Sequence, residues 1–88
     1  MNKQDLENLI NSAEYYLGKE MEISISRKIS IPNYKTFKFI EIKEIIGFSE
    51  ENEEMNFKPP IGVLKSSDGI VKNKPLSEIV KYFENKTN

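Results

Sequence analysis

The sequence contains no cysteine and no histidine among its 88 residues. Without cysteine, disulfide bonds, thiolate catalysis and cysteine-ligated zinc sites are excluded. Without histidine, the commonest general base and the commonest metal-binding side chain are missing, so serine–histidine and cysteine–histidine nucleophile systems cannot form. We therefore expect a protein that is not an enzyme, with no catalytic residues, no cofactor and no metal site.

Glycine is scarce, and the four glycines lie too far apart to form a phosphate-binding or dinucleotide-binding loop. No apolar run approaches the roughly 20 residues that cross a bilayer. Residues 1–7 are polar and partly acidic, which is not the pattern of a secretory signal. We expect a cytoplasmic protein that does not associate with membranes.

The length predicts one domain, residues 1–88, near the lower end of independent folding. A chain of this size buries roughly 60–65% of the surface that its unfolded form exposes. Nearly all elements must therefore share one core, and little of the chain is left to enclose a deep substrate cavity.

Two stretches repeat apolar residues at the helical period. Residues 3–19 predict an N-terminal helix, and Gly18 is suited to end it in a left-handed cap. Residues after Pro75, a residue favoured in the first turn of a helix, predict a C-terminal helix. The expected apolar stripes are Leu6, Leu9, Ile10, Ala13 and Leu17 in the first helix, and Leu76, Ile79, Val80 and Phe83 in the second.

Residues 21–31 alternate between apolar and polar, which predicts a half-buried strand. Residues 32–35 read as a turn, and residues 36–46 as a second strand. Its alternation slips, since Phe37 and Phe39 fall on one face and Ile40 and Ile42 on the other. Either a bulge near Phe39 returns the apolar residues to one side, or the strand is covered on both faces.

The remainder predicts a polar loop over residues 47–56 and a short hairpin formed by residues 61–64 and 70–72. Asp68 and Gly69 supply the turn of that hairpin. The fold class is therefore α+β: an antiparallel sheet of three or four strands with the N- and C-terminal helices packed on one face, in the order α-β-β-β-β-α. The strand at residues 61–64 is expected at an edge, where it could pair with a second copy.

The net charge is only −1, but the charges are segregated. The densest acidic group is Glu50, Glu51, Glu53 and Glu54. Such a group is typical of a solvated loop; it could also hold a hard cation weakly through its oxygens. A third interpretation is a line of negative charge that binds a basic groove on a partner protein and competes there with nucleic acid.

The predicted first hairpin is basic and carries aromatic residues. Cations suit phosphate binding and an aromatic ring suits base stacking, so this hairpin is the candidate nucleic-acid site. An ordinary charged strand face is the alternative, and the acidic pI of about 5.5 is unusual for a nucleic-acid-binding domain. The candidate residues are Arg27, Lys28, Tyr34, Lys35 and Lys38.

Three functional hypotheses follow from these patterns. The first is a small protein-binding regulator or inhibitor, of the anti-restriction or anti-CRISPR type encoded by a phage or mobile element, which uses the acidic loop against a basic partner surface. The second is a nucleic-acid-binding accessory protein that uses the basic hairpin. The third is a structural or oligomeric accessory domain without a ligand of its own.

Overall fold

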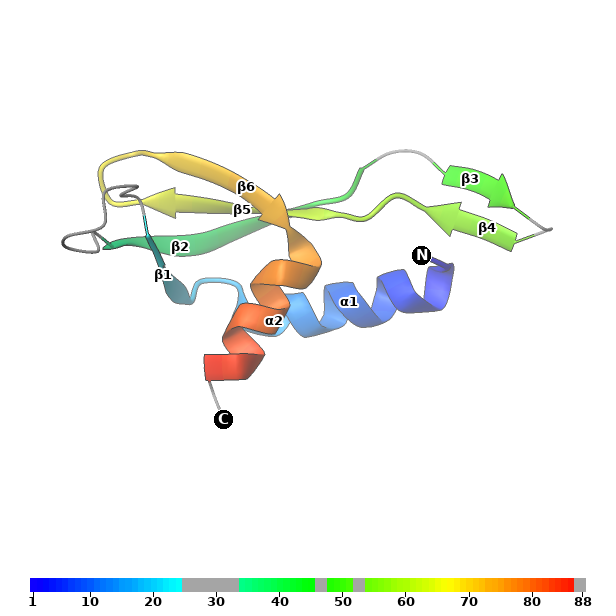
Figure 1. Cartoon of the computed structure of the whole chain (residues 1–88), viewed down its shortest axis with the longest axis horizontal. Helices are drawn as coiled ribbons and strands as arrows, with labels where there is room; N and C mark the ends of the chain where they lie inside the picture. Colours follow the sequence, from blue (N-terminus) through cyan, green and yellow to red (C-terminus); the bar gives the residue numbers. More distant parts are fainter. Residues whose placement is uncertain (25–33, 46–47, 52–53, 87–88) are drawn as a thin grey trace.

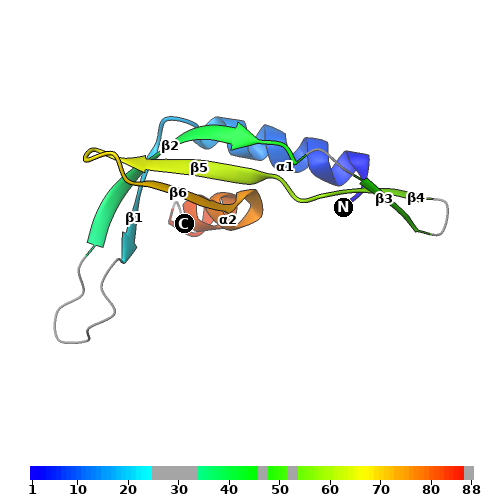
Figure 2. The same ribbon diagram turned by 90° about the horizontal axis from the view of Figure 1, so that it is seen from above.

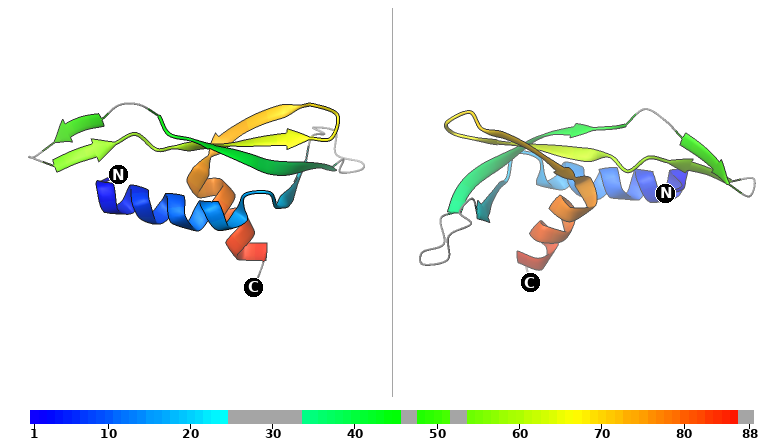
Figure 3. Two further views of the ribbon diagram at one scale, coloured as in Figure 1. Left: turned by 180° about the vertical axis from the view of Figure 1, so that it is seen from behind. Right: turned by 45° about the horizontal axis from the view of Figure 1, so that its top comes forward.

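A computed structural model describes residues 1–24, 34–45, 48–51 and 54–86, with the backbone alone at residues 48–51, 54 and 55. Its elements run in chain order as α1 (Lys3–Tyr16), β1 (Glu20–Ser24), β2 (Tyr34–Lys43), β3 (Phe48–Glu51), β4 (Glu54–Phe57), β5 (Ile61–Ser66), β6 (Val71–Pro75) and α2 (Leu76–Lys86). Figure 1 shows both helices below the main sheet, and Figure 3 shows the same arrangement from behind. The predicted α+β class is confirmed.

Four strands form the main antiparallel sheet in the order β1-β2-β5-β6. The expected antiparallel sheet of three or four strands with both helices on one face is thus confirmed, and it has four strands. Tyr34 and Lys35, which we expected in a turn, are instead the first residues of β2. The rest of that turn and the end of the expected first strand lie outside the described residues. The strand at 61–64 was wrongly expected at an edge, because β5 pairs with β2 on one side and β6 on the other.

Local signals set both ends of α1. The Asn2 side chain accepts a hydrogen bond from the Asp5 amide at 2.8 Å, which caps the N-terminus. Gly18, with a φ of 87°, ends the helix in the left-handed region as predicted. Leu17, predicted to lie on the buried stripe, is 40% exposed. It follows the last helical residue, so the helical spacing no longer places it on the buried face.

Of the two alternatives for β2, the bulge near Phe39 is the one that the structure shows. The register against β5 shifts between Phe39 and Glu41. Phe37 and Phe39 are fully buried, Ile40 is 45% exposed, and Ile42 again packs against the core. One extra residue therefore returns the apolar positions to one face, as a bulge does.

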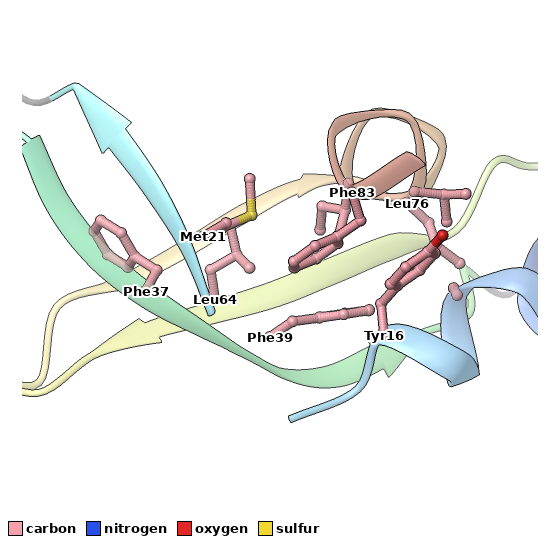
Figure 4. Close-up of a cluster of buried hydrophobic side chains, with 10 residues drawn as sticks. Tyr16, Met21, Phe37, Phe39, Leu64, Leu76 and Phe83 are labelled. Atoms are coloured by element: carbon pink, nitrogen blue, oxygen red, sulfur yellow. The ribbon is translucent and has the colours of Figure 1, made fainter. Parts of the chain in front are cut away.

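The core lies between the two helices and the inner face of the sheet (Figure 4). Tyr16 of α1 stacks on Phe83 of α2 with ring centroids 4.9 Å apart. Gly62 allows α2 to approach β5 closely, because a Cβ there would lie 2.4 Å from Ile79 Cδ1 and 2.9 Å from Phe39 Cε1. Both predicted helical stripes thus contribute to one core. Its buried members include Ala13, Tyr16, Met21, Phe37, Phe39, Leu64, Leu76, Ile79, Val80 and Phe83.

The acidic segment that we expected to be a loop is a two-stranded antiparallel ribbon, β3–β4. The loop prediction was based on polarity and gave too little weight to the apolar residues that flank the glutamates. The register pairs Phe48 with Phe57 and Glu50 with Met55. Aromatic residues opposite each other in the register, such as Phe48 and Phe57, favour strands even where charged residues intervene.

The ribbon extends from one end of a molecule that measures 51 × 25 × 25 Å (Figure 2). The start of α1 lies beside it. The Phe57 amide donates a hydrogen bond to the Met1 carbonyl at 2.7 Å, and the terminal amino group donates to Asn56 Oδ1 at 3.4 Å. The first residue of the chain therefore anchors the base of the ribbon to the helical layer.

Candidate binding surfaces

The acidic ribbon, defined here as residues 48–57, carries most of the predicted partner-binding residues. Glu50 and Glu51 lie in β3 and Glu54 in β4, whereas Glu53 lies outside the described residues. The register places Glu51 directly opposite Glu54. The fold therefore brings together on one short ribbon residues that the sequence showed only as neighbours in a loop.

The acids lie in a stretch of the chain without a base, bordered by Lys43 and Lys58. Residues 44–57 include five glutamates and neither lysine nor arginine. Strands also fix the backbone spacing, with about 3.4 Å between successive residues. The stretch that forms the ribbon thus carries a run of negative charge on an extended backbone, with no lysine or arginine between Lys43 and Lys58.

One cation of the predicted basic hairpin, Lys35, is paired with an acidic residue that the sequence did not place beside it. Lys35 Nζ forms an ion pair with Asp68 Oδ2 in the β5–β6 turn. Its charge is therefore offset within the molecule. Tyr34 is 58% exposed and Lys38 is also exposed, so these two candidates are accessible. Arg27 and Lys28 lie outside the described residues.

Asp68 is held in its turn by several hydrogen bonds. The Ser66 hydroxyl donates to Asp68 Oδ1 and accepts from the Ile70 amide at 3.0 Å. The Gly69 amide donates to the Ser66 carbonyl at 3.1 Å. Hydrogen bonds from Lys35 and then Ser66 hold the pKa of the Asp68 carboxyl below its usual 3.8. Asp68 therefore has the turn role that we predicted for it.

A groove of about 510 Å³ lies beside Lys38. Its second cation is Lys65 of β5, the direct cross-strand partner of Lys38. We missed Lys65 because only the register between β2 and β5 brings it to Lys38. The groove residues are Glu20, Thr36, Lys38, Ile40, Lys65, Ser66 and Ser67.

The rest of the described surface adds three observations. Among the described residues, no group of three or more acidic side chains is arranged to hold a metal ion. Lys86 has a raised pKa because of a hydrogen bond with Tyr82, at the exposed end of α2. Within the same residues, no helix is long and apolar enough to cross a membrane.

Comparisons of this chain with known protein families, with curated proteins and with solved structures found no match. Its function is therefore argued from its own surfaces.

Proposed function

We propose that this protein is a small, non-enzymatic cytoplasmic regulator that binds a basic surface of another protein through its acidic ribbon. The observation that carries the proposal is the run of four glutamates, Glu50, Glu51, Glu53 and Glu54, within the ribbon residues 48–57 at the end of the molecule, in a stretch, residues 44–57, that contains neither lysine nor arginine. Opposite charges across an interface steer association and select the partner. An end-on ribbon can reach into a groove that the wider helical layer could not enter.

The partner surface would be one that otherwise holds nucleic acid. A row of carboxylates on an extended backbone offers such a groove the negative charge that phosphates offer. Occupation of the groove would then inhibit the partner by competition. An inhibitor of the anti-restriction or anti-CRISPR type, encoded by a phage or mobile element, is the form of regulator that this mechanism suits.

Affinity capture with the immobilised protein from a nuclease-treated bacterial lysate tests the proposal. The variant that removes the charge of the acidic ribbon changes Glu50, Glu51, Glu53 and Glu54 to glutamine, and it is called the lure variant below. We expect the parent to retain a basic protein that the lure variant loses, and duplex DNA to displace that protein.

The matched control makes the same charge change elsewhere. Glu7, Glu14, Glu41 and Glu78 are exposed positions outside the ribbon, and their change to glutamine removes equal charge. We expect this control to retain the captured protein. Equal capture by the parent and the lure variant would contradict the proposal.

A second candidate function is supported by the groove at Lys38. Lys38 and Lys65 are paired across strands, Thr36 lies beside them, and Tyr34 offers an exposed ring on the same strand. Together these groups could bind the backbone and a base of single-stranded nucleic acid. Phosphate contacts by Arg27, Lys28, Lys38 and Lys65 would give log K a slope of about −3 against log salt on a single strand.

Fluorescence anisotropy with a labelled single-stranded oligonucleotide at low salt tests this second candidate. We expect Lys38→Gln with Lys65→Gln to weaken binding, and Lys35→Gln to have less effect because Asp68 already offsets Lys35. No binding at high protein concentration would rule it out.

A further inference from the structure

The main sheet ends in two edge strands, β1 and β6. An edge strand presents one row of backbone N–H and C=O groups without a neighbouring strand. Such a row can pair with an extended segment of another chain unless it is covered. The two edges of this sheet are treated differently by the fold.

The edge of β1 is closed by a side chain from α2. Tyr82 Oη accepts a hydrogen bond from the Glu22 amide at 3.3 Å and donates one to the Glu22 carbonyl at 3.4 Å. The ring is itself held against Phe83, with centroids 5.7 Å apart, and Lys86 Nζ lies 5.2 Å from its centroid. A strand could add to β1 only by displacing Tyr82.

Among the described residues, the edge of β6 has no equivalent cover. Within the part of the chain that the structure describes, no side-chain hydrogen bond like that of Tyr82 reaches the backbone of Val71–Asn73. Val71 is 54% exposed, Ile70 is 43% exposed, and Figure 1 shows the strand at the margin of the sheet. The start of β6 is therefore accessible to another backbone.

The side chains of β6 define what such a backbone must carry. Lys72 and Lys74 occupy alternate positions and so share one face of the strand. Lys72 is half-buried, with Nζ 5.8 Å from the Phe37 ring centroid, so its stem is positioned against the sheet. Among the described residues, neither lysine forms an ion pair.

Lysines on an edge repel a second cationic or apolar strand and so protect against unwanted pairing. A strand with carboxylates at alternate positions reverses the sign of that interaction, because opposite charges on neighbouring strands attract. We propose that the β6 edge takes up an extended acidic segment of a partner protein as a fifth strand of the main sheet.

Backbone amide shifts of the ¹⁵N-labelled protein test this inference, with an eight-residue peptide of alternating glutamate and valine as the probe. We expect saturable shifts that are largest at residues 70–74 and on the paired strand β5, and smaller at Met21–Ser24, which line one pocket with Lys74. Two control peptides carry lysine in place of glutamate, or N-methyl groups on alternate amides. We expect neither to bind, because the first repels Lys72 and Lys74 and the second cannot complete the ladder.

Matched variants locate the site. The double variant Lys72→Glu with Lys74→Glu should lower the affinity for the acidic peptide at least tenfold. The control Lys81→Glu with Lys43→Glu makes the same charge change at exposed positions away from this edge, and it should lower the affinity by less than threefold. The lure variant should bind the peptide as tightly as the parent, because its four changes lie in the ribbon and not on the β6 edge. Failure of the peptide to bind would therefore contradict the inference about β6 and leave the proposed function of the ribbon untouched.

Three outcomes would overturn the inference: no shifts at millimolar peptide, equal binding of the lysine peptide, or shifts centred on β1. Sedimentation velocity adds a fourth. If the protein without peptide forms a dimer that Lys72→Glu with Lys74→Glu dissociates, the edge is occupied by a second copy and not by an acidic partner.

Discussion

The helix-covered sheet and the acidic ribbon differ in what holds them together. The sheet is packed against a core in which Phe37, Phe39 and Leu64 are fully buried. The base of the ribbon is attached to Met1 by two hydrogen bonds. The Phe57 amide donates to the Met1 carbonyl, and the Met1 amino group donates to the Asn56 side chain. Isolated two-stranded hairpins are marginal in water, so the ribbon depends on this attachment.

The comparison shows that stability and charge are concentrated in different parts of the molecule. Apolar burial stabilises the sheet end, whereas the ribbon end carries glutamates without bases between residues 44 and 57. Changes in the ribbon should therefore alter binding without unfolding the protein, and changes in the core should do the reverse. The following experiments test that separation, from the largest expected effect to the smallest.

Phe83→Ala should have the largest effect on stability. Phe83 is 6% exposed and stacks on Tyr16, and emptying a buried phenylalanine site costs about 3–5 kcal/mol. Leu9→Ala should cost less, about 1–2 kcal/mol, because Leu9 is only half-buried at the margin of the core. Urea melts followed by circular dichroism measure both. Parent-like melting of Phe83→Ala would show that α2 is not part of the core.

Gly62→Ala should lower the free energy of unfolding by about 1–3 kcal/mol, the range for overpacking a core. The added Cβ would overlap Ile79 Cδ1 and Phe39 Cε1. Ile79→Val removes the Cδ1 atom, so the double variant should be more stable than the two single effects predict. A thermal-melt double-mutant cycle measures this coupling. Additive effects would mean that α2 shifts to accommodate the methyl group.

Tyr82→Phe should cost about 0.5–1.5 kcal/mol, the usual net value for a lost hydrogen-bonding group. It also uncovers the edge of β1, so the Glu22 amide should exchange with solvent faster. Hydrogen exchange followed by NMR measures the effect. Tyr15→Phe, at a residue that is 71% exposed, is the control and should leave Glu22 exchange unchanged.

Asp68→Asn should give a smaller loss that depends on pH. The pKa of Asp68 is lowered in the fold, so the charged form contributes stability above pH 3.8, its usual pKa, and that contribution disappears as the pH falls through the lower folded value. The stability gap between the parent and the variant should therefore close in acid. Urea melts between neutral pH and about pH 2 measure it, and a gap that persists at the acidic limit would contradict the assignment.

Glu51→Gln should have the smallest effect, under about 0.5 kcal/mol, as expected for a position outside any core. The register opposes Glu51 to Glu54, and like charges opposite each other are unfavourable, so a slight gain is the expected sign. A urea melt beside that of Phe83→Ala measures the contrast. A loss as large as that of Phe83→Ala would show that the ribbon is part of the cooperative core.

Much of the fold could be predicted because the signals are local. The 3.6-residue period identified the buried faces of both helices apart from Leu17, and the slip of alternation after Phe39 made a bulge one of two alternatives, the one that the register shows. The β3–β4 ribbon was missed because its glutamates outweighed Phe48 and Phe57, which the register pairs. Polarity alone does not distinguish a loop from an exposed hairpin.

The candidate sites could be predicted less well, since their properties depend on neighbours far along the chain. Lys35 was expected to be free but is paired with Asp68, 33 residues away. Lys65 was not considered until the register placed it opposite Lys38. The residues were visible in the sequence, but their partners were not.

The sequence by itself determined the two helices, the strands of the main sheet apart from their exact ends, most of the core and the segregation of charge, because each depends on residue type and short-range spacing. Only the tertiary structure decided which charges are offset and which strands lie at the edges of the sheet. It also decided that Tyr82 closes the edge of β1, whereas among the described residues nothing equivalent covers the start of β6. The physical reason is that strand order and register join residues that are distant in the chain, and the energy of a charge or a backbone hydrogen-bonding group depends on what lies beside it.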